Sequence, residues 1–97
     1  MFVAAARVEI HIPEAASLKD KRRVVQSISR RLRNEFPVSV AEIEAQEQWS
    51  LAVLGIAVVS GSAGHARDVL EAALRHVERT RLDAEIGAVD IDVIQVF

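Results

Sequence analysis

The chain contains no cysteine and no tyrosine, only one tryptophan and three phenylalanines, and no long apolar run. Without cysteine it can form neither a disulfide nor a thiolate metal site. The longest apolar segment, Leu51–Val59, has the length of a strand and falls short of the roughly 20 residues that a membrane-spanning helix requires. The apolar start of the chain is interrupted by Arg7 and Glu9 and has no cleavage pattern, so it is predicted to be a strand rather than a signal peptide. We therefore expect a cytoplasmic protein.

Length and composition predict one domain that spans residues 1–97. Hydrophobic residues make up 51% of the chain, which excludes a disordered protein. The formal net charge of −2 argues against a protein whose whole surface coats nucleic acid, because such proteins are usually strongly basic. The charges are segregated along the chain, however, so one surface can still be basic.

Hydrophobic periodicity predicts four strands and two helices in the order β-α-β-β-α-β. The predicted strands are Phe2–Ile12, Val38–Ala45, Ser50–Ser60 and Ala84–Val96, and the predicted helices are Ser17–Arg33 and His65–Arg81. This order predicts an α+β, ferredoxin-like fold with a four-stranded antiparallel sheet. Both crossover helices must cover the same face, so the other face of the sheet is left open. Lys21 falls in the apolar stripe of the first helix, and we expect its ammonium group to extend past the end of the sheet into water.

An excess of positive charge marks the first helix. Residues 17–33 hold seven of the twelve Lys and Arg residues and a single acid, Asp20. At about 100° per residue, five cations fall within one stripe roughly 100° wide that contains no acid. They are Lys19, Arg22, Arg23, Arg30 and Arg33. Like charges repel until an outside group neutralises them, so the stripe predicts an anionic partner, and the alternative is a solvated face that only aids solubility.

The open face of the sheet is predicted to combine charges with an apolar row. Its charges are Arg7, Glu9 and His11 on the first strand and Asp90 and Asp92 on the last. The third strand adds either Leu51, Val53, Ala57 and Val59 or Ala52, Leu54, Ile56 and Val58. An exposed apolar row beside mixed charges predicts packing of two sheet faces into a homodimer, with a monomer as the alternative. The acids and His11 could instead converge on a metal or act as an acid–base pair, but charge pairing with Arg7 is the simpler expectation.

No catalytic motif is present. The segment Gly61–Gly64 lacks the lysine of a P-loop and the glycine spacing of a dinucleotide site, so we expect a flexible loop and a helix N-cap. His65 and His76 lie about three helical turns apart, too far to share a metal ion. Trp49 is expected to cap the core beyond the second strand, with an interface anchor as the alternative. We expect no catalytic residue, cofactor or metal site, and hence no enzyme.

Two segments carry a family resemblance, HIPEAASLKDKRRVVQSISRRLRNEFPVSVAEIE and WSLAVLGIAVVS. They resemble the YlxP-like bacterial proteins, a family of unknown function. The most specific pieces are Ser17–Lys19, Lys21–Arg22, Arg31–Arg33, Val38–Glu42 and Leu54–Ala57. The resemblance implies a ferredoxin-like domain, often a dimer, and carries no catalytic residues. In some bacteria the family is encoded close to ribosome-maturation and translation-initiation factors, which implies a role near RNA or the ribosome.

The first functional hypothesis is a small module that docks on RNA or on a ribosome-associated ribonucleoprotein. The cations of the first helix would hold phosphates and read little sequence: Lys19, Arg22, Arg23, Arg30 and Arg33. Base stacking on the sheet is not expected, because the first and third strands have no aromatic residue beyond Phe2. The alternative is an ACT-like metabolite-sensing or scaffolding homodimer, whose ligand would lie at the dimer interface or beside Gly61–Gly64.

Overall fold

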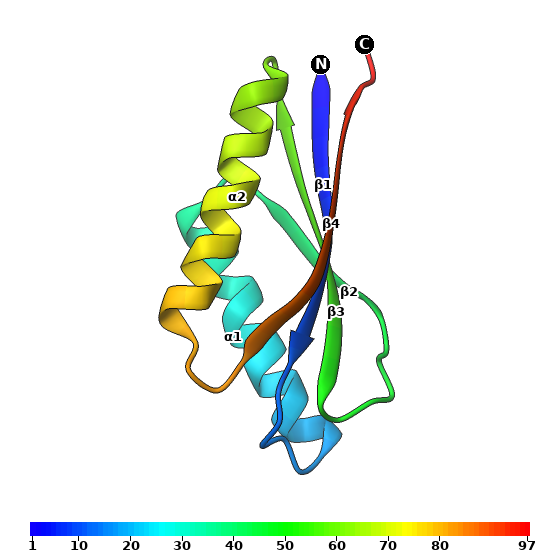
Figure 1. Ribbon diagram of the computed structural model, residues 1–97, viewed down its shortest axis with the longest axis vertical. Coiled ribbons are helices and arrows are strands. Elements are labelled where there is room, and N and C mark those ends of the chain that lie inside the picture. The colour runs from blue at the N-terminus through cyan, green and yellow to red at the C-terminus, as the bar shows by residue number, and fades with distance from the viewer.

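The structure, a computed structural model, describes residues 1–97 and confirms the predicted order of elements. The strands are β1 (Phe2–His11), β2 (Ser39–Glu44), β3 (Leu51–Ser60) and β4 (Glu85–Gln95), and the helices are α1 (Leu18–Glu35) and α2 (Ala63–Thr80). The strands form an antiparallel sheet in the order β2-β3-β1-β4. Both helices cover one face of the sheet and leave the other open, as the ferredoxin-like prediction requires (Figure 1).

The core lies between the helices and the covered face of the sheet, where 17 buried residues form one hydrophobic cluster. Of the two possible rows on β3, the one that faces this core is Ala52, Leu54, Ile56 and Val58. The other row, which contains Val53 and Val59, therefore lies on the open face. The central strand β3 can be apolar on both sides because both sides are covered. Helices pack on one side, and charged side chains of neighbouring strands cross the other.

Serine side chains cap both helices. The hydroxyl of Ser17 accepts a hydrogen bond from the amide of Asp20 at 3.1 Å, and α1 begins at Leu18. The hydroxyl of Ser62 accepts one from the amide of His65 at 3.3 Å, and α2 begins at Ala63 rather than at the predicted His65. The serine cap outweighs the poor helix propensity of Gly64, which is why the predicted start is too late. Neither helix is both long enough and apolar enough to cross a membrane.

Two β-bulges alter the edge strands. Strand β4 has one residue more than β1 between its pairings with Val8 and Ile10, and this irregularity includes Gly87, a residue type that often marks a bulge inside a strand. An ideal Cβ on Gly87 would lie 2.6 Å from Nε2 of His11, so the imidazole fills the space that the glycine leaves. In β2 the register with β3 shifts around Ile43, which places that side chain against Gly55 on the open face.

Candidate functional site

Helix α1 presents the predicted basic stripe to solvent. Its inward side packs over β2 and β3 through buried residues that include Val25, Ile28 and Leu32. The five predicted cations are all exposed: Lys19, Arg22, Arg23, Arg30 and Arg33. The helical repeat brings them onto one surface because they lie three, four, seven or eight residues from their neighbours in the stripe.

The cations of this stripe have no acidic partner within the protein. The six ion pairs of the structure include none of these five side chains. The one acid of the segment, Asp20, is used at the helix start, where its Oδ2 accepts a hydrogen bond from the amide of Ala16 at 3.0 Å. The positive potential along α1 is therefore uncompensated by nearby carboxylates.

Helix α2 has a balanced surface by comparison. Arg67 and Glu71, whose spacing of four residues favours pairing on a helix, form an ion pair with Nε and Oε1 separated by 3.1 Å. Glu71 and Arg75 have the same spacing but do not pair. At the end of α2, Arg81 binds the carboxylate of Asp83 at 2.8 Å and donates to the hydroxyl of Ser27 at 2.9 Å. This arginine therefore joins α2 to α1 and is not a free cation.

The prediction for Lys21 is wrong, because its ammonium group is buried instead of extending into water. Its side chain leaves the buried side of α1, and Nζ donates hydrogen bonds to two carbonyl oxygens of the segment that joins β2 to β3 and to one at the start of β3. The acceptors are Ala45 at 2.8 Å, Gln46 at 3.2 Å and Leu51 at 3.3 Å. Oε2 of Glu42 lies 2.9 Å from Nζ but has no hydrogen-bond donor, so this contact is an ion pair without hydrogen-bond geometry.

The prediction that Trp49 caps the core is also wrong. This residue lies in the same segment that Lys21 binds, and its side chain is 55% exposed rather than packed as a cap on the core. It is absent from the hydrophobic cluster and from the partly buried residues that pack against it. The sequence identified Trp49 as a candidate interface residue but could not show that the chain turns it outward.

The charge pairing expected on the open face is formed in part, between Arg7 and Glu9. Arg7 pairs with neither Asp90 nor Asp92, although Asp90 is its direct partner on β4. Its guanidinium instead reaches across β3 to Glu44, and Nη1 lies 3.3 Å from Oε1 of Glu9. Hydrogen bonds to these two glutamates, Glu44 first, raise the pKa of Arg7 above its ordinary value. Gly55 lies opposite Arg7 on β3, and the space beside this glycine is filled by Ile43.

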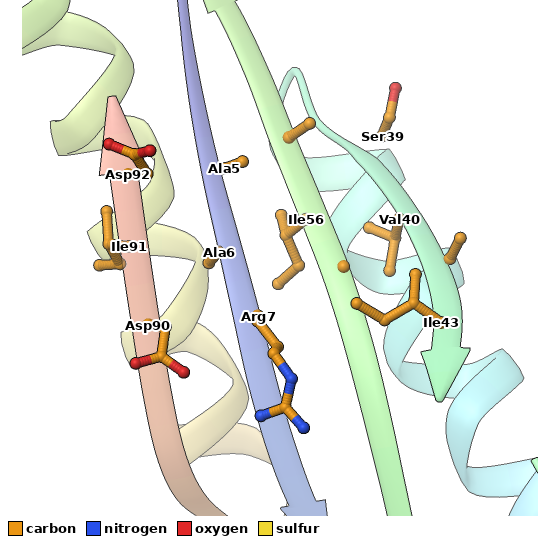
Figure 2. A pocket seen from close by; sticks show the side chains of 13 residues that line it. Ala5, Ala6, Arg7, Ser39, Val40, Ile43, Ile56, Asp90, Ile91 and Asp92 are labelled. Atoms are coloured by element: carbon orange, nitrogen blue, oxygen red, sulfur yellow. The ribbon is translucent and has the colours of Figure 1, made fainter. Parts of the chain in front are cut away.

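A shallow trough of about 560 Å³ runs across the same face. Figure 2 shows Asp90 and Asp92 on β4 at one margin, Arg7 on β1, and Ile43 on β2 at the other margin. Small residues of three neighbouring strands line it: Ala5, Ser39, Ala41, Gly55 and Ala57. Beyond the trough, Val59 and Ile94 are exposed on either side of Val3, which pairs with both. The trough and this row join into an apolar area with carboxylates along one margin.

The alternative metal and acid–base sites are not assembled. No group of three or more His, Cys, Asp or Glu side chains is close enough to hold a metal ion. Glu9 is bound to Arg7, and His11 packs against Gly87. His76 is buried beside Phe36 in an edge-on ring contact of 5.5 Å, and its Nδ1 lies 3.6 Å from Oε2 of Glu35, a contact that is ionic only when the imidazole is protonated.

Comparison with known proteins gives a family without an assigned activity. A family profile described as "Protein of unknown function (DUF503)" matches residues 3–91. The chain is 37% identical over 77 residues to the "Uncharacterized protein YlxP" of Bacillus subtilis (strain 168). That alignment covers 79% of this chain and 84% of the Bacillus protein.

Proposed function

Because this chain belongs to the DUF503 family, whose function is unknown, its residues must carry the functional argument, and we propose that it docks on RNA or on a ribonucleoprotein through α1. The observation that supports the proposal is the set of exposed cations that no carboxylate of the protein neutralises. The proposed residues are Lys19, Arg22, Arg23, Arg30 and Arg33. In this proposal the protein acts in the cytoplasm and has no catalytic role.

Phosphate groups fit this surface for electrostatic and geometric reasons. Arginine donates paired hydrogen bonds to phosphate oxygens, and charge-assisted bonds of this kind are about twice as strong as neutral ones. A row of cationic side chains along a helix contacts successive phosphates of the RNA backbone and few base edges, so the binding would depend weakly on the RNA sequence. Each phosphate that is neutralised releases condensed counterions, which makes the affinity fall steeply with salt concentration.

The proposal predicts salt-dependent RNA binding that charge reversal on α1 removes. The logarithm of the affinity for a single strand should fall by about 0.7 per phosphate contacted for each tenfold increase in salt. The double variant Arg23→Glu, Arg30→Glu should lose most of this affinity because two attractive charges become repulsive. Fluorescence anisotropy with a labelled RNA at several salt concentrations measures both effects.

The matched control reverses two arginines on α2, Arg75→Glu and Arg79→Glu. Both are exposed and lie outside every ion pair, and the change in net charge equals that of the α1 variant. If RNA binding depends on α1, the control should bind nearly as well as the parent protein. Equal losses in the two variants, or unchanged binding in the α1 variant, would contradict the proposal.

A second candidate function is an ACT-like metabolite-sensing or scaffolding homodimer that packs through the open sheet face. The trough supports this candidate, since its volume of about 560 Å³ lies within the range of small-molecule sites. The exposed apolar side chains of Val59 and Ile94 beside it favour self-association. A thermal-shift screen of small metabolites distinguishes the candidates, because a specific rise in melting temperature at micromolar ligand favours sensing.

A further inference from the structure

We propose that the segment joining β2 to β3 and the first turns of α1 form one site for single-stranded RNA, in which an unpaired base stacks on Trp49. This inference rests on the proposed docking of RNA through α1 and names the form of RNA that fits. Its starting observation is that the only tryptophan of the chain leaves 55% of its side chain exposed. An exposed indole offers every base a flat surface for stacking, whatever the sequence.

Lys21 fastens the tryptophan-bearing segment to α1. Its ammonium group binds the carbonyl oxygens of Ala45 and Gln46 before Trp49 and that of Leu51 after it. A single buried side chain of the helix thus holds both ends of the segment. The connection between β2 and β3 consequently lies beside the first turns of α1, at the lower end of the molecule in Figure 1.

The backbone on both sides of Trp49 is also fixed by hydrogen bonds. The amide of Gln48 donates to the carbonyl of Ala45 at 3.0 Å, and the carbonyl of Ser50 accepts from the amide of Ile12 at 2.8 Å. The indole is therefore carried by an ordered turn rather than by a loose loop. Stacking on it requires little further loss of backbone freedom, which favours binding.

The phosphate-binding groups start at the same end of the helix. Lys19 and Arg22 flank Lys21 in the sequence, and both are exposed and outside every ion pair. Side chains of a helix lean toward its N-terminus, which brings Arg22 toward the first turn. At about 100° per residue Lys21 lies roughly 150° around the helix from the centre of the stripe. A strand that contacts both the stripe and Trp49 therefore passes around the N-terminal end of α1.

A single strand fits this arrangement better than a duplex. Bases inside a duplex are already stacked on one another, whereas an unpaired base can turn onto an aromatic side chain. Exposed Glu47, two residues before Trp49, repels phosphate, which favours contact with the segment through a base rather than through the backbone. The site thus pairs one base contact with a row of phosphate contacts.

Tryptophan fluorescence tests the inference directly, because the emission comes from Trp49 alone. The parent protein is titrated with an unstructured RNA of about a dozen nucleotides and with the same strand annealed to its complement. The single strand should quench the emission and bind more tightly than the duplex. Trp49→Ala should weaken single-strand binding by about 10-fold, with Trp49→Phe retaining part of the affinity. The salt dependence of Trp49→Ala should match that of the parent, since the indole binds no phosphate.

Leu82→Ala is the matched control, because Leu82 is a 99% exposed apolar residue in the connection between α2 and β4. Its RNA affinity should equal that of the parent protein. Salt-dependent binding without quenching, with Trp49→Ala at parental affinity, would overturn the stacking site and leave docking through α1 intact. An equal loss in Leu82→Ala would also overturn it. Absence of any RNA binding would overturn both proposals together.

Discussion

At the scale of the residue, Lys21 is the most unusual feature of the molecule. A lysine with a fully buried side chain loses the hydration of its charge, which is costly unless the protein supplies replacement partners. Here three carbonyl oxygens and the carboxylate of Glu42 take that role. The ammonium group has as many hydrogen-bond acceptors as it has protons, so the buried charge is fully satisfied.

Replacing Lys21 by methionine should destabilise the protein by about 3 kcal/mol, within the range for breaking a buried ion pair. The substitution keeps an unbranched chain but leaves Glu42 and three carbonyl oxygens without their cation. Urea unfolding followed by circular dichroism measures the loss. The double variant Lys21→Met, Glu42→Gln should recover part of it, because no unpaired carboxylate remains. A loss below about 1 kcal/mol would contradict this account of Lys21.

The wrong predictions for Lys21 and Trp49 have one physical cause. The apolar spacing of α1 identified Lys21 as lying within the buried stripe, and that position is confirmed. Which groups its ammonium would meet depends on the path of the segment from Ala45 to Leu51, which no local pattern encodes. The outward direction of Trp49 follows from the same path, since a turn residue faces the core or water according to how the turn is held.

At the scale of the element, α1 and α2 have the same length and differ in how the charges on their outer surfaces are paired. Both have 18 residues and a serine N-cap. Helix α2 pairs Arg67 with Glu71 on its own surface, whereas the exposed cations of α1 are unpaired. Repulsion along α1 lowers its intrinsic stability, so its cap and its packing on β2 and β3 must compensate.

Removing the cap of α1 should therefore be measurable. Ser17→Ala should lower the free energy of unfolding by about 1 kcal/mol, because the amide of Asp20 loses its acceptor. Ser62→Ala, the equivalent change on α2, serves as the comparison and should cost a similar or smaller amount, since its hydrogen bond is longer, 3.3 Å against 3.1 Å. Thermal or urea unfolding measures both, and an unchanged stability in Ser17→Ala would count against the role of this cap.

At the scale of the whole molecule, the two faces differ in charge and in polarity. The helical side carries the unpaired cations of α1, and the open sheet face carries the trough, exposed apolar side chains and the unpaired Asp90 and Asp92. A dimer formed by packing two open faces would leave both basic stripes on its outer surfaces. Two stripes on one particle would raise the apparent affinity for a long RNA through multivalency.

The proposed homodimer is testable with Val59, which is 62% exposed on the open face. Val59→Lys should shift the protein from dimer to monomer in sedimentation experiments, because a lysine cannot be buried in an apolar interface without a partner. The stability of the monomer should change by no more than about 0.5 kcal/mol, as expected for an exposed position. Leu82→Lys adds the same charge elsewhere and should leave the association unchanged. A monomeric parent protein, or a dimeric Val59→Lys variant, would contradict the proposal.

The amino-acid sequence by itself determined the order of strands and helices, the ferredoxin-like fold, the family and the basic stripe on α1. The elements, the fold and the stripe follow from periodicities of two and 3.6 residues and from charges close together along the chain, which are local properties. The family follows from the resemblance of whole segments. The tertiary structure alone decided the burial of Lys21, the exposure of Trp49, the choice of row on β3 and the pairing of Arg7 with Glu44. Each of these depends on contacts between residues far apart in the chain, which packing and register fix and local patterns do not.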